Sequence, residues 1–191
     1  MRGRGRVIGP AALLALALAL AAAAPKVQAA CSPLTFRNSL QEPRPGDLYL
    51  RAGRATCTSL EIEIAAQDVS GIFTVGFDLA YPADQLKFEG HAAGPLLTQN
   101  APRTPPLVLA RGAGAGRVQV SITRFAPDGS AAAEGSEVVL TLRFSRLAAG
   151  TGSIDFGFEP GSGVAERILD DQGEPVTARF GPGHGGTVVV P

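Results

Sequence analysis

The chain has 191 residues, of which 45% are hydrophobic and 18% are charged, with 17 basic and 17 acidic residues and two cysteines. A chain of this length can form one domain with a sizeable core. Beyond the first six residues the chain contains no basic cluster, which argues against a nucleic acid as the partner.

The first thirty residues have the pattern of a secretory signal peptide. Arg2, Arg4 and Arg6 form a basic start, and Ala11–Ala24 is a nearly pure Ala/Leu run. The small residues before position 31 suit a signal peptidase. A membrane-spanning helix needs about 20 apolar residues, and this run is shorter. We therefore predict a signal peptide over 1–30, and a protein exported to the periplasm or the extracellular space.

Cleavage there leaves 13 basic and 17 acidic residues, a net charge of about −4, and retains Cys31 and Cys57. In an oxidising compartment these two cysteines can form a disulfide that stabilises the fold by about 3 kcal/mol. Alternatively, Cys31 is the lipid-modified first residue of an anchored lipoprotein. Ala29 and Ala30 suit that alternative, whereas Gln28 occupies the position of an expected aliphatic residue. The even number of cysteines favours the Cys31–Cys57 disulfide, and the lipid anchor is its alternative.

The mature chain begins with a polar, Pro-containing segment, predicted as an extended lead-in over 31–44. Pro45–Asp47 is predicted as a turn, followed by a short strand around Leu48 and Leu50 that ends at Arg51–Arg54. Leu60–Ile64 alternates strictly and predicts a half-buried strand. Its outward carboxylates, Glu61 and Glu63, are expected to be a solvated face rather than an acid/base pair.

The strongest strand signal lies between Phe73 and Tyr81. Apolar residues occupy the odd positions, and Thr74, Gly76 and Asp78 lie between them. A period of two indicates one face in the core and one in water. Pro82 ends the strand because it cannot donate a hydrogen bond to the next one.

Further short strands follow, separated by Gly, Pro and Asp turns. A helical turn is possible at Ala131–Gly135, and Val139 is predicted to point outward. The strands are expected near 86–88, 107–109, 118–122, 137–144, 154–158, 164–169, 176–180 and 187–190. This pattern predicts an all-β, single-domain jelly-roll β-sandwich of about eight or nine strands over 45–191.

The residues that could carry chemistry are sparse. His91 and His184 are isolated and have no ligand spacing around them, so neither a metal nor a cofactor is predicted. Asp170–Glu174 is better explained as a turn than as a calcium loop. Tyr49 is the one aromatic residue expected to be exposed as a platform for sugar rings. We expect no enzymatic activity; a site built from scattered carboxylates is the enzyme alternative.

Laid out in order, these segments resemble a cohesin domain over Pro45–Val190. The resemblance is carried by eight segments, Pro45–Asp47, Val69–Pro82, Leu86–Phe88, Gly94–Leu97, Gly116–Ile122, Gly135–Phe144, Ala149–Gly152 and Gly186–Val190. It implies a nine-stranded flattened jelly roll that binds dockerins through one sheet face, with the calcium held by the dockerin. In this alignment the family's outward polar contacts fall on Thr74 and Gly76, and Asp78 lies two residues further along.

The resulting hypothesis is an exported, non-enzymatic, cohesin-like module of a polysaccharide-degrading system. It would recognise a dockerin-type protein or a polysaccharide through a sheet face. The candidate contact residues are Thr74, Asp78, Gln119 and Ser121. The alternative hypothesis is a structural component of a cell-envelope or secretion assembly.

Overall fold

The computed structural model describes residues 31–191 except 100–103, 115, 126–127, 158–166 and 182. The chain divides into Met1–Cys31, of which only Cys31 is described, and Ser32–Pro191, which holds every described strand. The predicted signal peptide therefore lies outside the described residues. In the described part no helix is long and apolar enough to cross a membrane.

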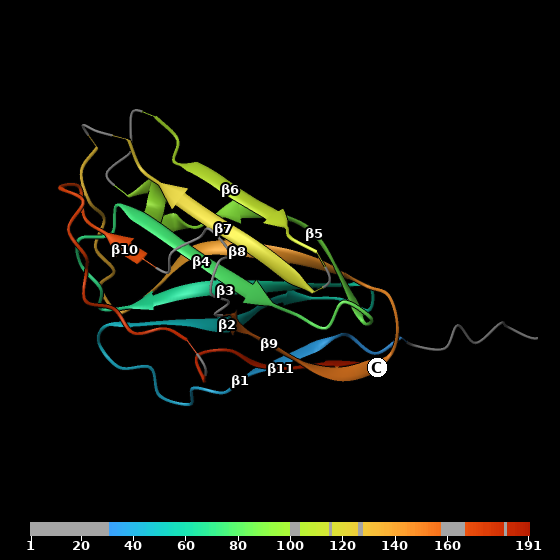
Figure 1. Cartoon of the computed structure of the whole chain (residues 1–191). Coiled ribbons are helices and arrows are strands. Elements are labelled where there is room, and N and C mark those ends of the chain that lie inside the picture. Colours follow the sequence, from blue (N-terminus) through green and yellow to red (C-terminus); the bar gives the residue numbers. More distant parts are fainter. Residues whose placement is uncertain (1–30, 100–103, 115, 126–127, 158–166, 182) are drawn as a thin grey trace, which may run out of the picture. The chain divides into compact units, whose positions relative to one another are not determined.

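The larger sheet has seven antiparallel strands in the order β1-β11-β9-β4-β7-β6, and β10 also pairs with β4. Figure 1 shows β4, β7 and β6 side by side. The bounds are β1 Thr35–Asn38, β4 Thr74–Ala80, β6 Leu107–Gly112, β7 Arg117–Thr123, β9 Gly150–Gly157, β10 Arg167–Leu169 and β11 Gly186–Val190.

The smaller sheet has four antiparallel strands in the order β2-β3-β8-β5. The bounds are β2 Asp47–Ala55, β3 Ser59–Gln67, β5 Leu86–Ala93 and β8 Ser136–Arg146; a short 3-10 helix, η2, follows β5 at Pro95–Thr98. The predicted all-β sandwich is confirmed. The lead-in expected over 31–44 contains an unpredicted strand, β1, which pairs with β11.

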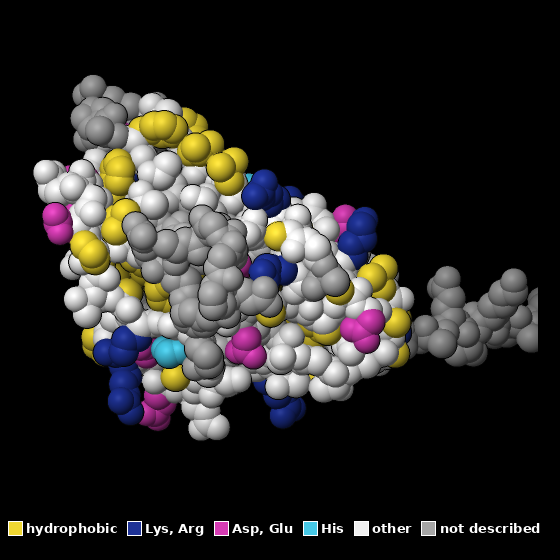
Figure 2. Space-filling view, viewed as in Figure 1, with side chains coloured by type: hydrophobic (Ala, Val, Ile, Leu, Met, Phe, Trp, Pro, Cys, Tyr) yellow, Lys and Arg dark blue, Asp and Glu magenta, His cyan; other side chains and the backbone are white. Residues whose placement is uncertain are grey.

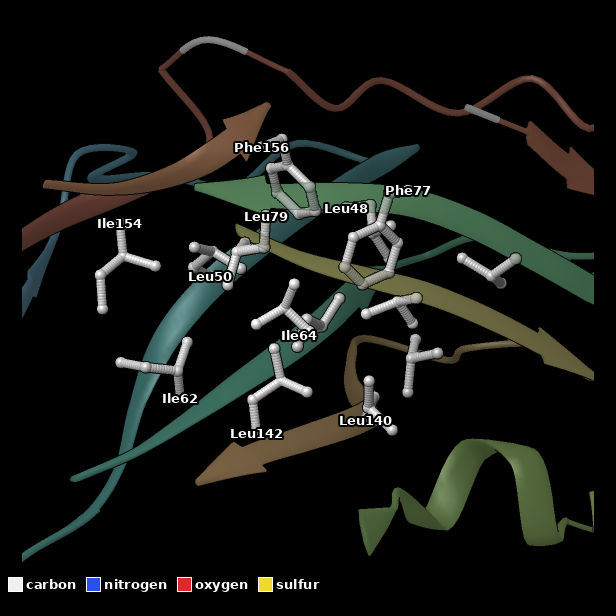
Figure 3. Close-up of a cluster of buried hydrophobic side chains, with 14 of the residues drawn as sticks. Leu48, Leu50, Ile62, Ile64, Phe77, Leu79, Leu140, Leu142, Ile154 and Phe156 are labelled. Carbon is white, nitrogen blue, oxygen red and sulfur yellow. The ribbon is translucent and has the colours of Figure 1, made fainter. Parts of the chain in front are cut away.

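The core lies between the two sheets, and Figure 3 shows side chains from both meeting there. Phe77 of β4 is fully buried, and its ring meets that of Phe156 edge-on, with ring centroids 5.3 Å apart. Phe180 also packs against Phe156, with ring centroids 5.5 Å apart. Edge-to-face aromatic pairs of this kind add about 0.5–1.5 kcal/mol to the stabilisation from burial alone.

Strand β4 occupies the middle of the larger sheet. It pairs with β7 along its whole length, from Thr74 to Ala80. On its other edge, β9 pairs with the second half of the strand and β10 with the first half. Because β4 has neighbours on both sides, its outward face lies at the centre of a broad sheet.

Two predictions about the smaller sheet are wrong because of β-bulges. Strand β2 does not end at Arg51 but continues to Ala55, with a register shift between Ala52 and Ala55. In β8, the register changes opposite Ile64 and Ala65, so Val139 is an extra residue that joins the buried core instead of pointing outward. A bulge breaks the period of two on which the sequence prediction relied.

The turn predictions have mixed outcomes. Asp170–Gly173 is the expected hairpin turn: the Gly173 N–H donates to the Asp170 carbonyl at 3.1 Å, and Gly173 has a positive φ of 82°. Ala131–Gly135 contains no helical turn; Ala131 instead forms a β-bridge with Ile72. Predicted strand residues 164–166 lie outside the described residues.

Both cysteines are disulfide-bonded, and they are the only two in the chain. The disulfide and the lipid modification would use the same Cys31 sulfur, so the two alternatives exclude each other. The structure therefore agrees with the disulfide.

We expect Cys57→Ser to lower the free energy of unfolding by about 3 kcal/mol, because the disulfide closes a loop in the unfolded chain. Urea unfolding of the non-reduced protein measures the loss. Wild type in dithiothreitol is the control and should unfold like the variant. If Cys57→Ser and non-reduced wild type unfold together, the bond is not formed.

A buried carboxylate fastens the start of β2 to the segment before β11. Asp47 is 3% exposed, and its carboxylate accepts hydrogen bonds from Arg179 Nε at 2.8 Å and from the Arg44 N–H at 2.7 Å. His184 Nε2 lies 3.6 Å from the same carboxylate. Burial raises the pKa of Asp47, but these hydrogen bonds and positive charges outweigh burial and hold its pKa below the ordinary 3.8.

We expect Asp47→Ala to cost about 2 kcal/mol near neutral pH, because it removes hydrogen bonds to a charged group. A lowered pKa means that the ionised form stabilises the fold above the ordinary pKa. That contribution is lost as the pH falls through the folded-state value. The gap in unfolding free energy between wild type and variant should therefore narrow in acid. Asp84→Ala, at an exposed carboxylate, should show no such gap.

Candidate functional site

The four predicted contact residues lie together on the outward side of β4 and β7. Thr74 is opposite Thr123, Gly76 is opposite Ser121, and Asp78 is opposite Gln119. We number these three cross-strand pairs as the first, second and third rows. Strand β6 extends each row, because Leu107, Leu109 and Arg111 pair with Thr123, Ser121 and Gln119. We call the outward side of β4, β7 and β6 the candidate face.

The first and third rows are held by hydrogen bonds between neighbouring strands. Thr74 Oγ1 and Thr123 Oγ1 are 2.9 Å apart. Arg111 donates to Gln119 Oε1 from its Nη2 at 3.1 Å and from its Nε at 3.3 Å. In the second row Gly76 has no side chain, so the exposed Ser121 hydroxyl faces a shallow place in the sheet.

Asp78 differs from the expectation of a solvent-facing contact. It is 2% exposed, although it lies on the outward side of β4. Neither of its carboxylate oxygens has a hydrogen-bond partner within the described residues. The nearest cation is Arg117 Nη1, which lies 3.9 Å from Oδ2. A buried carboxylate without hydrogen bonds costs folding free energy and leaves acceptors that a donor could satisfy.

Two exposed leucines of the candidate face were not predicted as contacts. Leu107 is 45% exposed and Leu109 is 57% exposed. Figure 2 shows hydrophobic side chains in a row along the side of the molecule where Figure 1 draws β6. Exposure alternates from Leu107 to Arg111, and Val108 and Ala110 are partly buried against the core, so the two leucines face outward. The sequence gives no such signal, because the residues from 107 to 110 are all apolar.

The outward side of the smaller sheet, which we call the charged face, has a different chemistry. Arg51 Nε donates to Glu63 Oε2 at 2.7 Å, and Glu61 lies opposite Arg143 in the register. Lys87 Nζ and Ser145 Oγ both bind Glu89, at 3.1 and 2.6 Å. The prediction that Glu61 and Glu63 belong to a solvated face therefore agrees with the structure.

Tyr49 does not form the exposed platform that the sequence suggested. It is 5% exposed, and its hydroxyl lies 2.5 Å from Ser136 Oγ. Tyr49 pairs with Ala65, which leaves room for the ring to lie down on the sheet. The alternation of Leu48, Tyr49 and Leu50 predicts the side on which the ring lies but not its burial by neighbouring strands.

Among the described residues no group of three or more His, Cys, Asp or Glu side chains is arranged to hold a metal. His91 lies on β5 of the smaller sheet, and His184 lies in the segment before β11 of the larger sheet. Burial raises the pKa of Asp155 on β9, and a hydrogen bond from the Gly185 backbone opposes that rise. The Asp155 carboxylate accepts this backbone hydrogen bond, so we assign it a structural role.

No family model and no curated protein matches the sequence. Solved structures do match. The second type II cohesin module of the adaptor scaffoldin of Acetivibrio cellulolyticus has a TM-score of 0.56 at 10% identity, over 72% of this chain and 86% of that one. A type II cohesin domain from the cellulosome of the same organism has a TM-score of 0.54 at 15% identity, over 72% and 91%.

A chain of a type II cohesin–X-dockerin complex from Acetivibrio cellulolyticus also matches. Its TM-score is 0.50 at 12% identity, over 70% of this chain and 91% of that one. These likenesses show the fold. The chain is a cohesin-like β-sandwich, and the resemblance read from the sequence is confirmed at that level.

We expect Asp78→Asn to raise the free energy of unfolding by about 1 kcal/mol, because a neutral amide costs less to bury than a carboxylate that accepts no hydrogen bond. Asp84→Asn is a matched control: it changes the net charge equally at an exposed position and should leave stability unchanged. Chemical denaturation measures both variants. A loss of stability in Asp78→Asn would show that Arg117 satisfies the carboxylate.

Proposed function

We propose that the chain is an exported, non-enzymatic binding module that recognises a protein of the dockerin type through the candidate face. The observation that carries this proposal is the contrast between the two outward faces. On the charged face, acidic groups are paired with arginine, lysine or serine. The candidate face combines two exposed leucines, an exposed serine and a buried carboxylate, Asp78, that accepts no hydrogen bond within the described residues and has only a long ion pair with Arg117.

The mixture on the candidate face suits a protein partner. The centres of protein interfaces are poor in charge and contain apolar anchors ringed by hydrogen-bonding groups. Leu107 and Leu109 supply the apolar part, and the hydroxyls of Thr74, Ser121 and Thr123 supply the polar part. The face is built on paired strands, so it is rigid before binding, which lowers the cost of association.

A polysaccharide is the less favoured partner. Sugar rings usually stack on exposed aromatic side chains, and the expected platform, Tyr49, is buried. Phe125, just beyond β7, is 39% exposed and is the one large aromatic among the exposed hydrophobic residues of the described chain. One ring at the end of a strand does not make the flat row that a glycan chain needs.

The dockerin assignment rests on likeness of fold. A chain with the same architecture occurs in a structure of a cohesin–X-dockerin complex. Here the positions aligned with the family's polar contacts hold Thr74 and Gly76, so the hydroxyls of Thr74, Ser121 and Thr123 would carry the polar recognition. Export is supported by the signal-peptide pattern of 1–30 and by the disulfide, which is typical of oxidising compartments.

The test is to immobilise the disulfide-bonded protein and capture partners from exported proteins of its source, in buffer containing calcium. Captured proteins are identified by mass spectrometry, and affinity is then measured with the purified partner. Repeated failure to enrich any exported protein would reject the proposal. Retention on a glycan array with no protein captured would favour the polysaccharide alternative instead.

Two arginine substitutions locate the binding surface. Ser121→Arg places a bulky charge beside Gly76 on the candidate face, and we expect about a 30-fold weaker affinity, as for the loss of one hot-spot residue. Thr141→Arg makes a comparable change on the charged face, opposite Glu63, and should leave the affinity unchanged. Equal losses of affinity in the two variants would show that the partner does not bind through the candidate face.

A further inference from the structure

Strand β6 is an unprotected sheet edge. Exposed edges can pair with other chains, and proteins usually shorten, bulge or cover them. The other edge strands carry such protection: β1 has four residues, β2 shifts register between Ala52 and Ala55, and β5 shifts between Phe88 and Gly90. Strand β6 has six residues in unbroken register with β7.

The backbone of β6 offers hydrogen-bonding groups on its open side. The Ala113 N–H donates to the Arg117 carbonyl of β7 at 2.9 Å. Because the direction of these groups alternates along an antiparallel strand, the odd-numbered residues of β6 bond to β7. The N–H and C=O groups of Val108, Ala110 and Gly112 then point away from β7. In the described part of the chain no hydrogen bond uses them.

A groove of about 440 Å³ runs over β6 and β7. It is lined by residues 108–111 of β6, by residues 119–121 of β7 and by His91 of β5. Strands β5 and β6 belong to different sheets and are not hydrogen-bonded to each other. Figure 1 shows β6 at the margin of its sheet, with β7 as its neighbour.

We propose that β6 pairs antiparallel with β6 of a second copy of this chain, about a two-fold axis at Leu109. In this register Leu109 lies beside the partner's Leu109, as a pair without mutual hydrogen bonds. Such pairs have the closer side chains, about 4.5 Å between Cα atoms. Val108 then lies opposite the partner's Ala110, which brings their open backbone groups together. The two seven-stranded sheets become one continuous sheet.

A second copy is the occupant that fits because β6 is complementary to itself. Its one charged residue is Arg111, and in the proposed register Arg111 lies opposite the partner's Leu107, so no like charges meet. The arginine stem can cover that leucine while its charge remains in water. A two-fold contact also closes on itself, which gives a dimer and not a filament.

The dimer is expected to be weak. Stable interfaces usually bury more than about 1,000 Å² in total, and one pair of six-residue strands provides less than a typical interface. We therefore expect a dissociation constant on the order of 10–100 μM, visible as association that rises with concentration.

The first experiment is sedimentation velocity on the disulfide-bonded protein from about 1 μM to about 500 μM. Wild type should shift towards a dimer with concentration, and Leu109→Lys should stay monomeric because two ammonium groups would meet at the axis. Leu147→Lys is the matched control, since Leu147 is 55% exposed but lies in the β8–β9 turn; it should dimerise like wild type. A wild type that stays monomeric throughout, or a Leu109→Lys dimer of undiminished affinity, overturns the proposal.

A second measurement tests the register independently of surface charge. Leu109→Cys should form an intermolecular disulfide under mild oxidation, because the two residues at the axis are adjacent. Leu147→Cys should cross-link far more slowly at the same concentration. Equal cross-linking of the two variants would overturn the β6 pairing. This pairing does not depend on the dockerin-type function, because it is measured on the purified chain alone.

Discussion

The structure depends on the inward row of β4, where Val75, Phe77 and Leu79 are fully buried. Phe77 packs against Phe156 of β9, so the two rings connect neighbouring strands of the larger sheet on the side that faces the smaller sheet. Since successive residues of a strand alternate between faces, a buried inward row necessarily holds Thr74, Gly76, Asp78 and Ala80 outward. The same constraint builds the core and sets the centre of the candidate face.

The part of the fold that could be predicted is the part that follows a period of two. Val75–Tyr81, Leu60–Ile64 and Arg117–Thr123 alternate without interruption, and their inward residues agree with the structure. Phe73, predicted to point inward, instead lies before β4 and outside the core, where Ile72 is buried. Prediction failed where a bulge adds a residue, as at Val139 and in the second half of β2. Hydrophobicity does not distinguish an extra inward residue from an outward one, because only the partner strand defines the register.

For the candidate face, the sequence identifies which residues point outward but not what surrounds them. Asp78 was correctly assigned to the outward side of β4, yet its burial depends on neighbours distant in sequence. The sequence predicts a short strand near 107–109 but not the exposure of Leu107 and Leu109, because that exposure depends on which strands lie beside theirs in the sheet. Tyr49 shows the converse, since its burial comes from packing on the outward side of the smaller sheet.

Leu109 connects the two proposed surfaces. It belongs to the second row of the candidate face, beside Ser121, and to the open edge of β6. A second copy paired at β6 would cover part of this leucine and would bring two candidate faces side by side in one sheet. A partner that uses Leu109 as an anchor then competes with the second copy, whereas one that binds over β4 and β7 meets a divalent surface. Linkage between the two equilibria requires that any change in dimer affinity caused by the partner is matched by an equal change in partner affinity caused by dimerisation. The sign of that coupling depends on how much of the Leu109 side chain the partner buries.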